Sequence, residues 1–296
     1  MIDDPGLVAA LLVNGVISGA VLSLMAVGFA IVYAATGHFH VAQAAVFAVA
    51  GYGVFVAIDS GLGLLVALVV GLACGVVVGL GTNRFLYRPL EARGTSRLMV
   101  LIASLAVSIA ADNALAIAFS AEPKFISAPS LKESLLSVGD VNVTVLQFAG
   151  FVVGIVGLVA TGLYLSATRQ GRGIRAAAEN PSLAQALGLP LSKLKTRVFL
   201  AGSLLAATAG AYSAFEAGAA PGRGLGVFLI AAIAVIAGGV GSITGAAAAA
   251  FVIGIVQSLS LLVVSESWST TIVFAMFIAW IVVRPEGLAP SGIRAS

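Results

Sequence analysis

The chain is poor in the residues on which enzymes and nucleic-acid-binding proteins rely. Charged residues make up 9% of its 296 positions, and it has one cysteine, Cys74, and two histidines. No Gly-Lys pair occurs, which excludes the phosphate-binding loop of nucleotide hydrolases, and the patterns HExxH and GxSxG are also absent. A single cysteine forms neither an internal disulfide nor a zinc site. We therefore expect no catalytic, cofactor or metal site in this chain.

Hydrophobic residues dominate instead, at 60% of the chain. The mean hydropathy of +1.12 lies outside the range of soluble domains and predicts an all-α, polytopic membrane protein, with one domain over residues 1–296. Because the glycine-rich residues 238–245 break a helix or make it re-entrant, we expect about eight or nine membrane-spanning segments. The apolar runs cover residues 7–33, 41–58, 62–86, 98–119, 144–165, 198–215, 227–237, 246–264 and 269–283.

Basic residues gather between these runs and predict which loops face the cytoplasm. Of the 15 Lys and Arg residues, four lie at positions 84–97, six at 169–197 and two in the tail after 283, and none precedes Arg84. The positive-inside rule then places the N-terminus outside, the C-terminus in the cytoplasm and residues 120–143 in an external loop. Within that loop, VGDVNV predicts a small hairpin. Topology explains the net charge of +3 without a nucleic-acid partner.

The longest polar segment, residues 168–197, contains a short helix with its own start and stop signals. Asn180 is a good N-cap, Pro181 suits the first helical position, and Gly188 followed by Pro190 suits the end. A helix of about two turns is unstable alone in water, so we expect it to dock on a cytoplasmic partner. An interfacial helix that rests on the bilayer or on the protein's own helix ends is the alternative. Three apolar residues are predicted to share its face: Leu183, Ala184 and Leu187.

Two further segments are rich in polar or glycine residues and are expected to lie at membrane depth. They are GHFHVAQAAVFAVAGY, residues 37–52, and GGVGSITGA, residues 238–246. Irregular backbone inside a bilayer is tolerated only where protein or a cavity covers it, so each segment either borders a solute pathway or packs helices tightly. Asp112 either lines the pathway or reaches interfacial water. The candidate pathway residues are His40, Gln43, Asp112, Asn113, Gly238, Gly239, Gly241 and Ser242.

Four segments, in order along the chain, resemble the permease subunits of branched-chain amino acid ABC importers of the LivH type. Residues 37–52 resemble GxxNFAHGxxxxxGAY, residues 172–190 resemble the family's cytoplasmic loop, residues 238–246 resemble GGxGSxxGA, and residues 284–288 resemble RPxGL. The resemblance implies that the loop at 168–197 holds a coupling helix, which docks in a groove of an ATPase subunit. The coupling residues would be Arg175, Glu179, Asn180, Pro181, Leu183, Ala184, Leu187 and Gly188.

The resemblance also implies a non-catalytic subunit of a bacterial inner-membrane importer. Its partners would be two cytoplasmic ATPases that bind ATP-Mg, a second permease of the LivM type or a second copy of the chain, and an external solute-binding protein. The solute would be a branched-chain or related amino acid.

Three departures from the family pattern leave urea, amides or another small organic solute as alternatives. They are His40 in place of Asn, Ala44 in place of Gly, and Ile230 where many members carry Lys. A stand-alone secondary transporter or channel needs titratable pairs in mid-membrane, and an intramembrane enzyme needs a nucleophile with its base or a metal cluster. The sequence shows neither.

Overall fold

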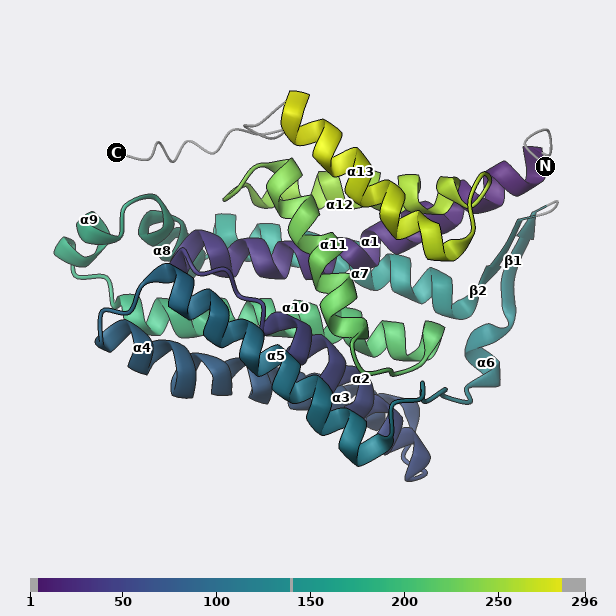
Figure 1. Ribbon diagram of the computed structural model, residues 1–296, viewed down its shortest axis with the longest axis horizontal. Helices are drawn as coiled ribbons and strands as arrows, with labels where there is room; N and C mark the ends of the chain where they lie inside the picture. The colour runs from purple at the N-terminus through teal and green to yellow at the C-terminus, as the bar shows by residue number, and fades with distance from the viewer. Residues whose placement is uncertain (1–4, 139–140, 284–296) are drawn as a thin grey trace.

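Helices form nearly all of the chain in the computed structural model, which describes residues 5–138 and 141–283 (Figure 1). The helices are α1 (Pro5–Thr36), α2 (Gln43–Asp59), α3 (Leu64–Gly81), α4 (Arg88–Ala92), α5 (Arg97–Phe119), α6 (Pro129–Lys132), α7 (Val145–Ala167), α8 (Arg169–Glu179), α9 (Pro181–Ala186), α10 (Leu191–Ala217), α11 (Arg223–Gly238), α12 (Ile243–Ser260) and α13 (Glu266–Val283). A π-helical stretch, η1 (Thr82–Tyr87), joins α3 to α4. Strand β1 (Ser134–Val138) pairs antiparallel with β2 (Val141–Thr144), which confirms the predicted hairpin, although its Gly139–Asp140 tip lies outside the described residues.

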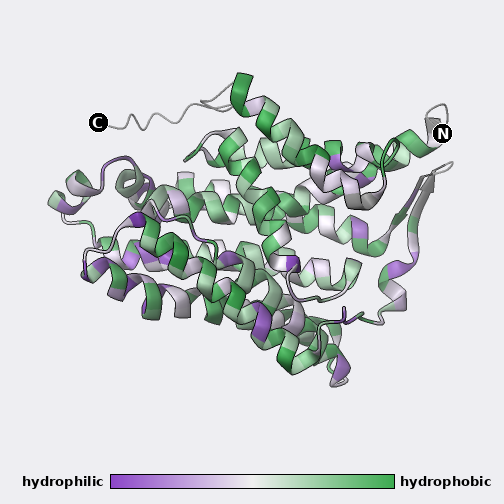
Figure 2. Cartoon of the chain, viewed as in Figure 1, coloured by the Kyte–Doolittle hydropathy of each residue, from purple (hydrophilic) through white to green (hydrophobic). Residues whose placement is uncertain are grey.

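The predicted apolar runs all fall on helices. Within the described residues, six helices are long and apolar enough to cross a membrane: α1, the continuous α3–η1–α4, α5, α7, α10 and α12. Three shorter apolar helices, α2, α11 and α13, complete the set. Hydrophilic residues gather around α4, α8 and α9 at one end and near the hairpin at the other, with mostly hydrophobic helices between (Figure 2). The chain is thus a multi-pass helical membrane protein, and the number of crossings stays a prediction.

Helix α1 lies at the centre of the bundle, where it packs against α7, α10, α11 and α12. In the most apolar 18-residue stretch of α1, 83% of the stretch is buried inside the protein, compared with 22% for α7 and 17% for α5. Small residues allow this packing: a Cβ on Gly15 would lie 2.7 Å from the Ile255 Cα of α12. In α3, three glycines at four-residue intervals, Gly71, Gly75 and Gly79, are buried against α2 and α10. Close backbone approach of this kind stabilises helix pairs in lipid.

The bundle has two distinct ends (Figure 1). We call the end that carries α4, α8 and α9 the α9 end, and the opposite end, with the start of α1 and the β1–β2 pair, the hairpin end. The two basic clusters at 84–97 and 169–197 meet at the α9 end. The predicted loop at 168–197 is more helical than expected. Residues 169–179 form α8, and residues 191–197 form the first turns of α10, where Leu194 packs into the core.

Candidate functional site

Helix α9 has the start and stop signals that the sequence predicts. The Asn180 Oδ1 accepts a hydrogen bond from the Leu183 amide at 2.9 Å, and Pro181 is the first helical residue. Gly188 has a φ of +80°, and the Leu189 amide donates to the Ala184 carbonyl at 3.0 Å, as in a Schellman helix stop. The helix contains six residues. It therefore forms a short, well-defined projection rather than a flexible loop.

The predicted apolar face of α9 divides in two. Ala184 is buried at 2% exposure, whereas Leu183 and Leu187 are 56% and 72% exposed. Residues 183 and 187 lie one turn apart and share a side, but residue 184 is rotated by about 100° from residue 183, because a helix has about 3.6 residues per turn. The prediction of one common face was therefore wrong: Ala184 holds α9 on the bundle, and the two leucines face outward.

A cavity of about 570 Å³ at the α9 end lies beside α8 and is lined by two segments that the sequence treated separately. The ends of α1 and α7, helix α8 and the turn between α11 and α12 form its walls. Arg175 and Glu179 contribute from α8, and Gly241 and Ser242 contribute from the turn. We call this the α9-end cavity. The predicted coupling segment and the glycine-rich segment therefore border the same cavity.

The glycine-rich turn between α11 and α12 depends on glycine for two physical reasons. Gly239 and Gly241 have φ values of +104° and +92°, which side chains strongly disfavour. Gly238 and Gly245 lie in close backbone contact, and a Cβ on Gly238 would also lie 2.6 Å from the Ala246 amide nitrogen. Ser242 caps α12 by accepting a hydrogen bond from the Gly245 amide at 3.0 Å. Both tight packing and a cavity wall are thus present at this segment.

The other polar segment, residues 37–42 and the start of α2, lies in the core. His40 is 1% exposed, and its Nδ1 lies 2.6 Å from the Tyr87 hydroxyl. Gln43 is fully buried, and its Nε2 donates to the Met25 carbonyl at 3.3 Å. Ser104 accepts a hydrogen bond from the Val41 amide at 3.3 Å. This conformation favours the packing interpretation for residues 37–43, and their role in translocation stays a prediction.

Asp112 and Asn113 lie on α5, far along the chain from the other candidate pathway residues. The Asn113 Nδ2 donates to the Ile109 carbonyl of its own helix at 2.8 Å, and Asn113 is exposed. Asp112 is half-buried, and its Oδ1 has no hydrogen-bond partner among the described residues. The eight predicted pathway residues therefore lie in three places: the core loop, α5 and the turn at the α9 end.

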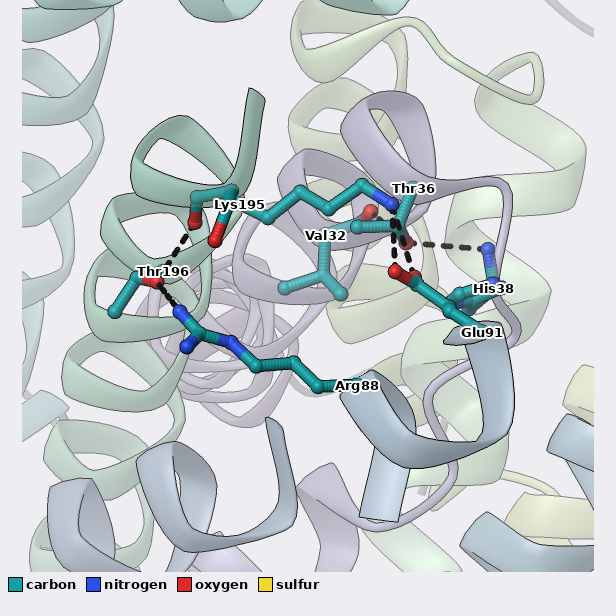
Figure 3. A network of polar contacts seen from close by, with 8 residues as sticks. Val32, Thr36, His38, Arg88, Glu91, Lys195 and Thr196 are labelled. Atoms are coloured by element: carbon teal, nitrogen blue, oxygen red, sulfur yellow. Dashed lines mark hydrogen bonds and ion pairs between the residues drawn. The ribbon is translucent and has the colours of Figure 1, made fainter. Parts of the chain in front are cut away.

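Sequence reasoning missed a polar network at the α9 end (Figure 3). Lys195 Nζ of α10 lies 2.9 Å from both Glu91 carboxylate oxygens of α4, and His38 Nδ1 lies 3.5 Å from Oε1. Burial lowers the pKa of His38, an effect that the Glu91 charge opposes. Arg88 donates to the Thr196 hydroxyl at 2.7 Å. Because these partners are distant in sequence, no local pattern indicated that Glu91 joins α4, α10 and the 37–42 loop.

Removing the shared acceptor tests this network. Glu91→Gln is expected to lower the free energy of unfolding by about 1 kcal/mol, since partly exposed ion pairs contribute modestly. The measurement is thermal unfolding of the purified protein in detergent. Glu122→Gln is the matched control, because Glu122 is exposed and makes no ion pair within the described part of the chain. Equal unfolding temperatures for both variants would contradict a stabilising role for Glu91.

A second group of residues was missed at the hairpin end. A cavity of about 440 Å³ there is lined by both Glu216 and Arg223, with the amides of Asn14, Gln147 and Gln257. We call it the hairpin-end cavity. Glu216 lies near the end of α10, and Arg223 is the first residue of α11. The sequence feature that could have indicated this cavity is the presence of polar residues inside apolar runs, such as Asn14 and Gln257. Within the described residues, no group of three or more His, Cys, Asp or Glu side chains could hold a metal.

Comparison with known proteins decides what this architecture is. The family model for the permease component of branched-chain amino acid transport systems matches residues 11–281. The chain belongs to this permease family. It is 29% identical to the high-affinity branched-chain amino acid transport permease BraD of Pseudomonas aeruginosa over 94% of both chains. It is 28% identical to LivH of Escherichia coli K12 over 93% of both chains.

A further relative agrees with this assignment, and a solved structure agrees with the fold. The probable branched-chain amino acid permease LivH of Methanocaldococcus jannaschii is 28% identical over 68% of this chain and 67% of its own length. The solved structure of PsaBC from Streptococcus pneumoniae, in complex with Fab, matches with a TM-score of 0.51 and 15% identity. That match covers 92% of this chain and 91% of the other, and it supports the fold alone. The sequence-based assignment to the permease family is therefore confirmed. One of the four motifs, RPEGL at 284–288, lies outside the described residues.

Proposed function

We propose that the chain is the transmembrane permease subunit of an ABC importer for branched-chain or related amino acids. The observation that carries this proposal is the geometry of α9, a capped helix of six residues that projects Leu183 and Leu187 outward from the end of an apolar bundle. Such a short helix gains stability by packing on a surface, and two leucines one turn apart suit a hydrophobic groove. Family membership supports an ATPase subunit as the owner of that groove.

The same proposal assigns sides and partners. The basic clusters at the α9 end support a cytoplasmic position for α9 in a bacterial inner membrane, with the N-terminus and the hairpin outside. Two cytoplasmic ATPases bind ATP-Mg, and this chain itself binds no cofactor and catalyses no reaction. A second permease, of the LivM type or a second copy, completes the membrane part. An external binding protein delivers the solute.

The contacts around α9 suggest how movement of the ATPases reaches the bundle. Helices α8 and α10 flank α9 closely in sequence, so displacement of α9 pulls on both. Through α8, which carries Arg175 and Glu179, the movement reshapes the α9-end cavity and the turn at 239–242. Through α10, the Lys195–Glu91 ion pair carries it to α4 and the 37–42 loop. Closure of the ATPases then switches the side on which the bundle opens, a domain-closure transition.

Reconstitution tests the proposed function. In proteoliposomes, the chain together with its ATPases, second permease and binding protein is expected to accumulate radiolabelled leucine only when ATP is supplied. The chain alone is expected to show neither leucine uptake nor ATP hydrolysis, because its sequence has no phosphate-binding loop. Uptake by the isolated chain, or ATP-dependent uptake that excludes every amino acid tested, would contradict the proposal.

A further inference from the structure

The hairpin-end cavity contains charges that the proposed coupling mechanism does not use. Its walls come from α1, α2, α7, α10, α11, α12 and α13, and its volume of about 440 Å³ suits a small molecule. Glu216 and Arg223 both line it. Ionisable side chains within a membrane protein are costly and usually mark a pathway for a solute or an ion. This cavity is therefore the strongest candidate for a site where the permease itself contacts its solute.

Helix stability does not explain the positions of these two charges. Glu216 lies one residue before the end of α10, where the helix dipole disfavours a negative charge. Arg223 is the first residue of α11, where the dipole disfavours a positive charge. Nor do they neutralise each other directly, because no ion pair joins them within the described residues, although the charge of Arg223 acts on Glu216. Two opposite charges thus line one cavity without pairing with each other.

The rest of the cavity complements a molecule with two charges and an apolar tail. Phe47, Val227 and Ile230 contribute apolar surface. At the rim, Gln147 Nε2 donates to Asn14 Oδ1 at 2.7 Å, and Gln147 Oε1 accepts from the Thr144 amide at 2.9 Å. The first of these hydrogen bonds joins α1 to the start of α7, and the second caps α7 itself. Together they preorganise this part of the cavity, as a binding site requires. Of the three departures from the family pattern, only Ile230 lines this cavity, where it keeps the wall apolar.

We propose that the hairpin-end cavity recognises the zwitterionic group of an α-amino acid with an apolar side chain. Glu216 binds the ammonium group, and Arg223 binds the carboxylate, for which a guanidinium offers paired donors. The side chain of the solute packs towards Phe47 and Ile230. This inference rests on the proposed function and adds to it a second selection step, made by the permease after the binding protein has delivered the solute.

Charge removal in the complete importer tests the site. Glu216→Gln and Arg223→Gln are each expected to lower leucine uptake at subsaturating leucine about tenfold or more, because each removes a hydrogen bond to a charged group. Glu122→Gln and Lys132→Gln, which neutralise exposed side chains between α5 and β1, are expected to retain wild-type uptake. Wild-type uptake by both cavity variants would overturn the proposal that this cavity binds the solute, but it would leave the proposed function intact. Failure of the wild-type complex to transport any amino acid would overturn the proposed function first.

A second measurement leaves both charges in place, so it holds even if the charge variants do not assemble. Ser213 lines the cavity, and Cys74 is the chain's own cysteine. In a Cys74→Ala background, Ser213→Cys introduces a thiol that a water-soluble maleimide labels in the assembled importer. Leucine is expected to slow this labelling several-fold, whereas leucinamide and N-acetylleucine, each lacking one charge, are not. Equal labelling rates with and without leucine would overturn the proposal.

Discussion

Leu187→Asp is expected to abolish co-purification of the chain with its ATPase partner while leaving the bundle folded. Leu187 is the C-cap residue of α9 and is 72% exposed, so its side chain contributes little to packing within the chain. In the proposed complex, the same side chain is buried in a hydrophobic groove. A carboxylate there loses its hydration without gaining a partner, which costs several kcal/mol. A loss of about 2–5 kcal/mol weakens a complex by roughly 30-fold or more.

The comparison needs a leucine that is also exposed but remote from α9. Leu135 of β1 is 47% exposed at the hairpin end, so Leu135→Asp is the matched control. Both variants are co-expressed with the ATPase, and a tag on the permease recovers the complex for quantification. Size-exclusion chromatography and circular dichroism of the permease check folding. If Leu187→Asp retains the ATPase at the level of Leu135→Asp, α9 is not the docking element.

Hydropathy predicted the helices well because a bilayer leaves the backbone few choices. Every peptide group in lipid must find its partner within the protein, so long apolar runs become helices whatever their neighbours do. The caps of α9 were equally local, since the Asn180 side chain and the αL conformation of Gly188 act within one turn. The early start of α10 was missed for the opposite reason. Polar residues 191–197 look the same to a hydropathy scale in a loop and in a helix that extends beyond the membrane.

The arrangement of the candidate sites depended on tertiary packing and was much less predictable. The sequence identified α9 and the turn at 238–245 as special, but not that α8 and this turn border one cavity. It also gave no means of pairing Glu216 with Arg223, because each charge alone resembles a helix-end residue near interfacial water. His40 shows the converse difficulty. Its ring packs against Tyr87 and Phe199, with centroid distances of 5.4 and 5.1 Å. A polar residue in a segment of small residues therefore belongs to the packed core here.

At the turn between α11 and α12, a single added methyl group is expected to be severely destabilising. A Cβ on Gly238 would overlap the backbone carbonyl of Gly245 and lie 2.6 Å from the Ala246 amide nitrogen. Both obstacles are main-chain atoms of the neighbouring helix, so no side-chain rotation relieves the overlap. Gly238→Ala is therefore expected to lower the free energy of unfolding by about 2–3 kcal/mol, as overpacking of a dense interior does. The readouts are the midpoint of thermal unfolding in detergent and the yield of monodisperse protein.

Another glycine of the same helix separates this contact from the general effect of replacing glycine. Gly226 of α11 is exposed, and an added Cβ there meets no atom within 4 Å. Gly226→Ala is expected to leave stability unchanged or raise it by up to about 1 kcal/mol, because alanine favours helix more than glycine does. Equal unfolding midpoints for the two variants would show that α11 and α12 do not need backbone contact. A large difference would mean that this contact fixes the turn, and with it the Gly241 and Ser242 wall of the α9-end cavity.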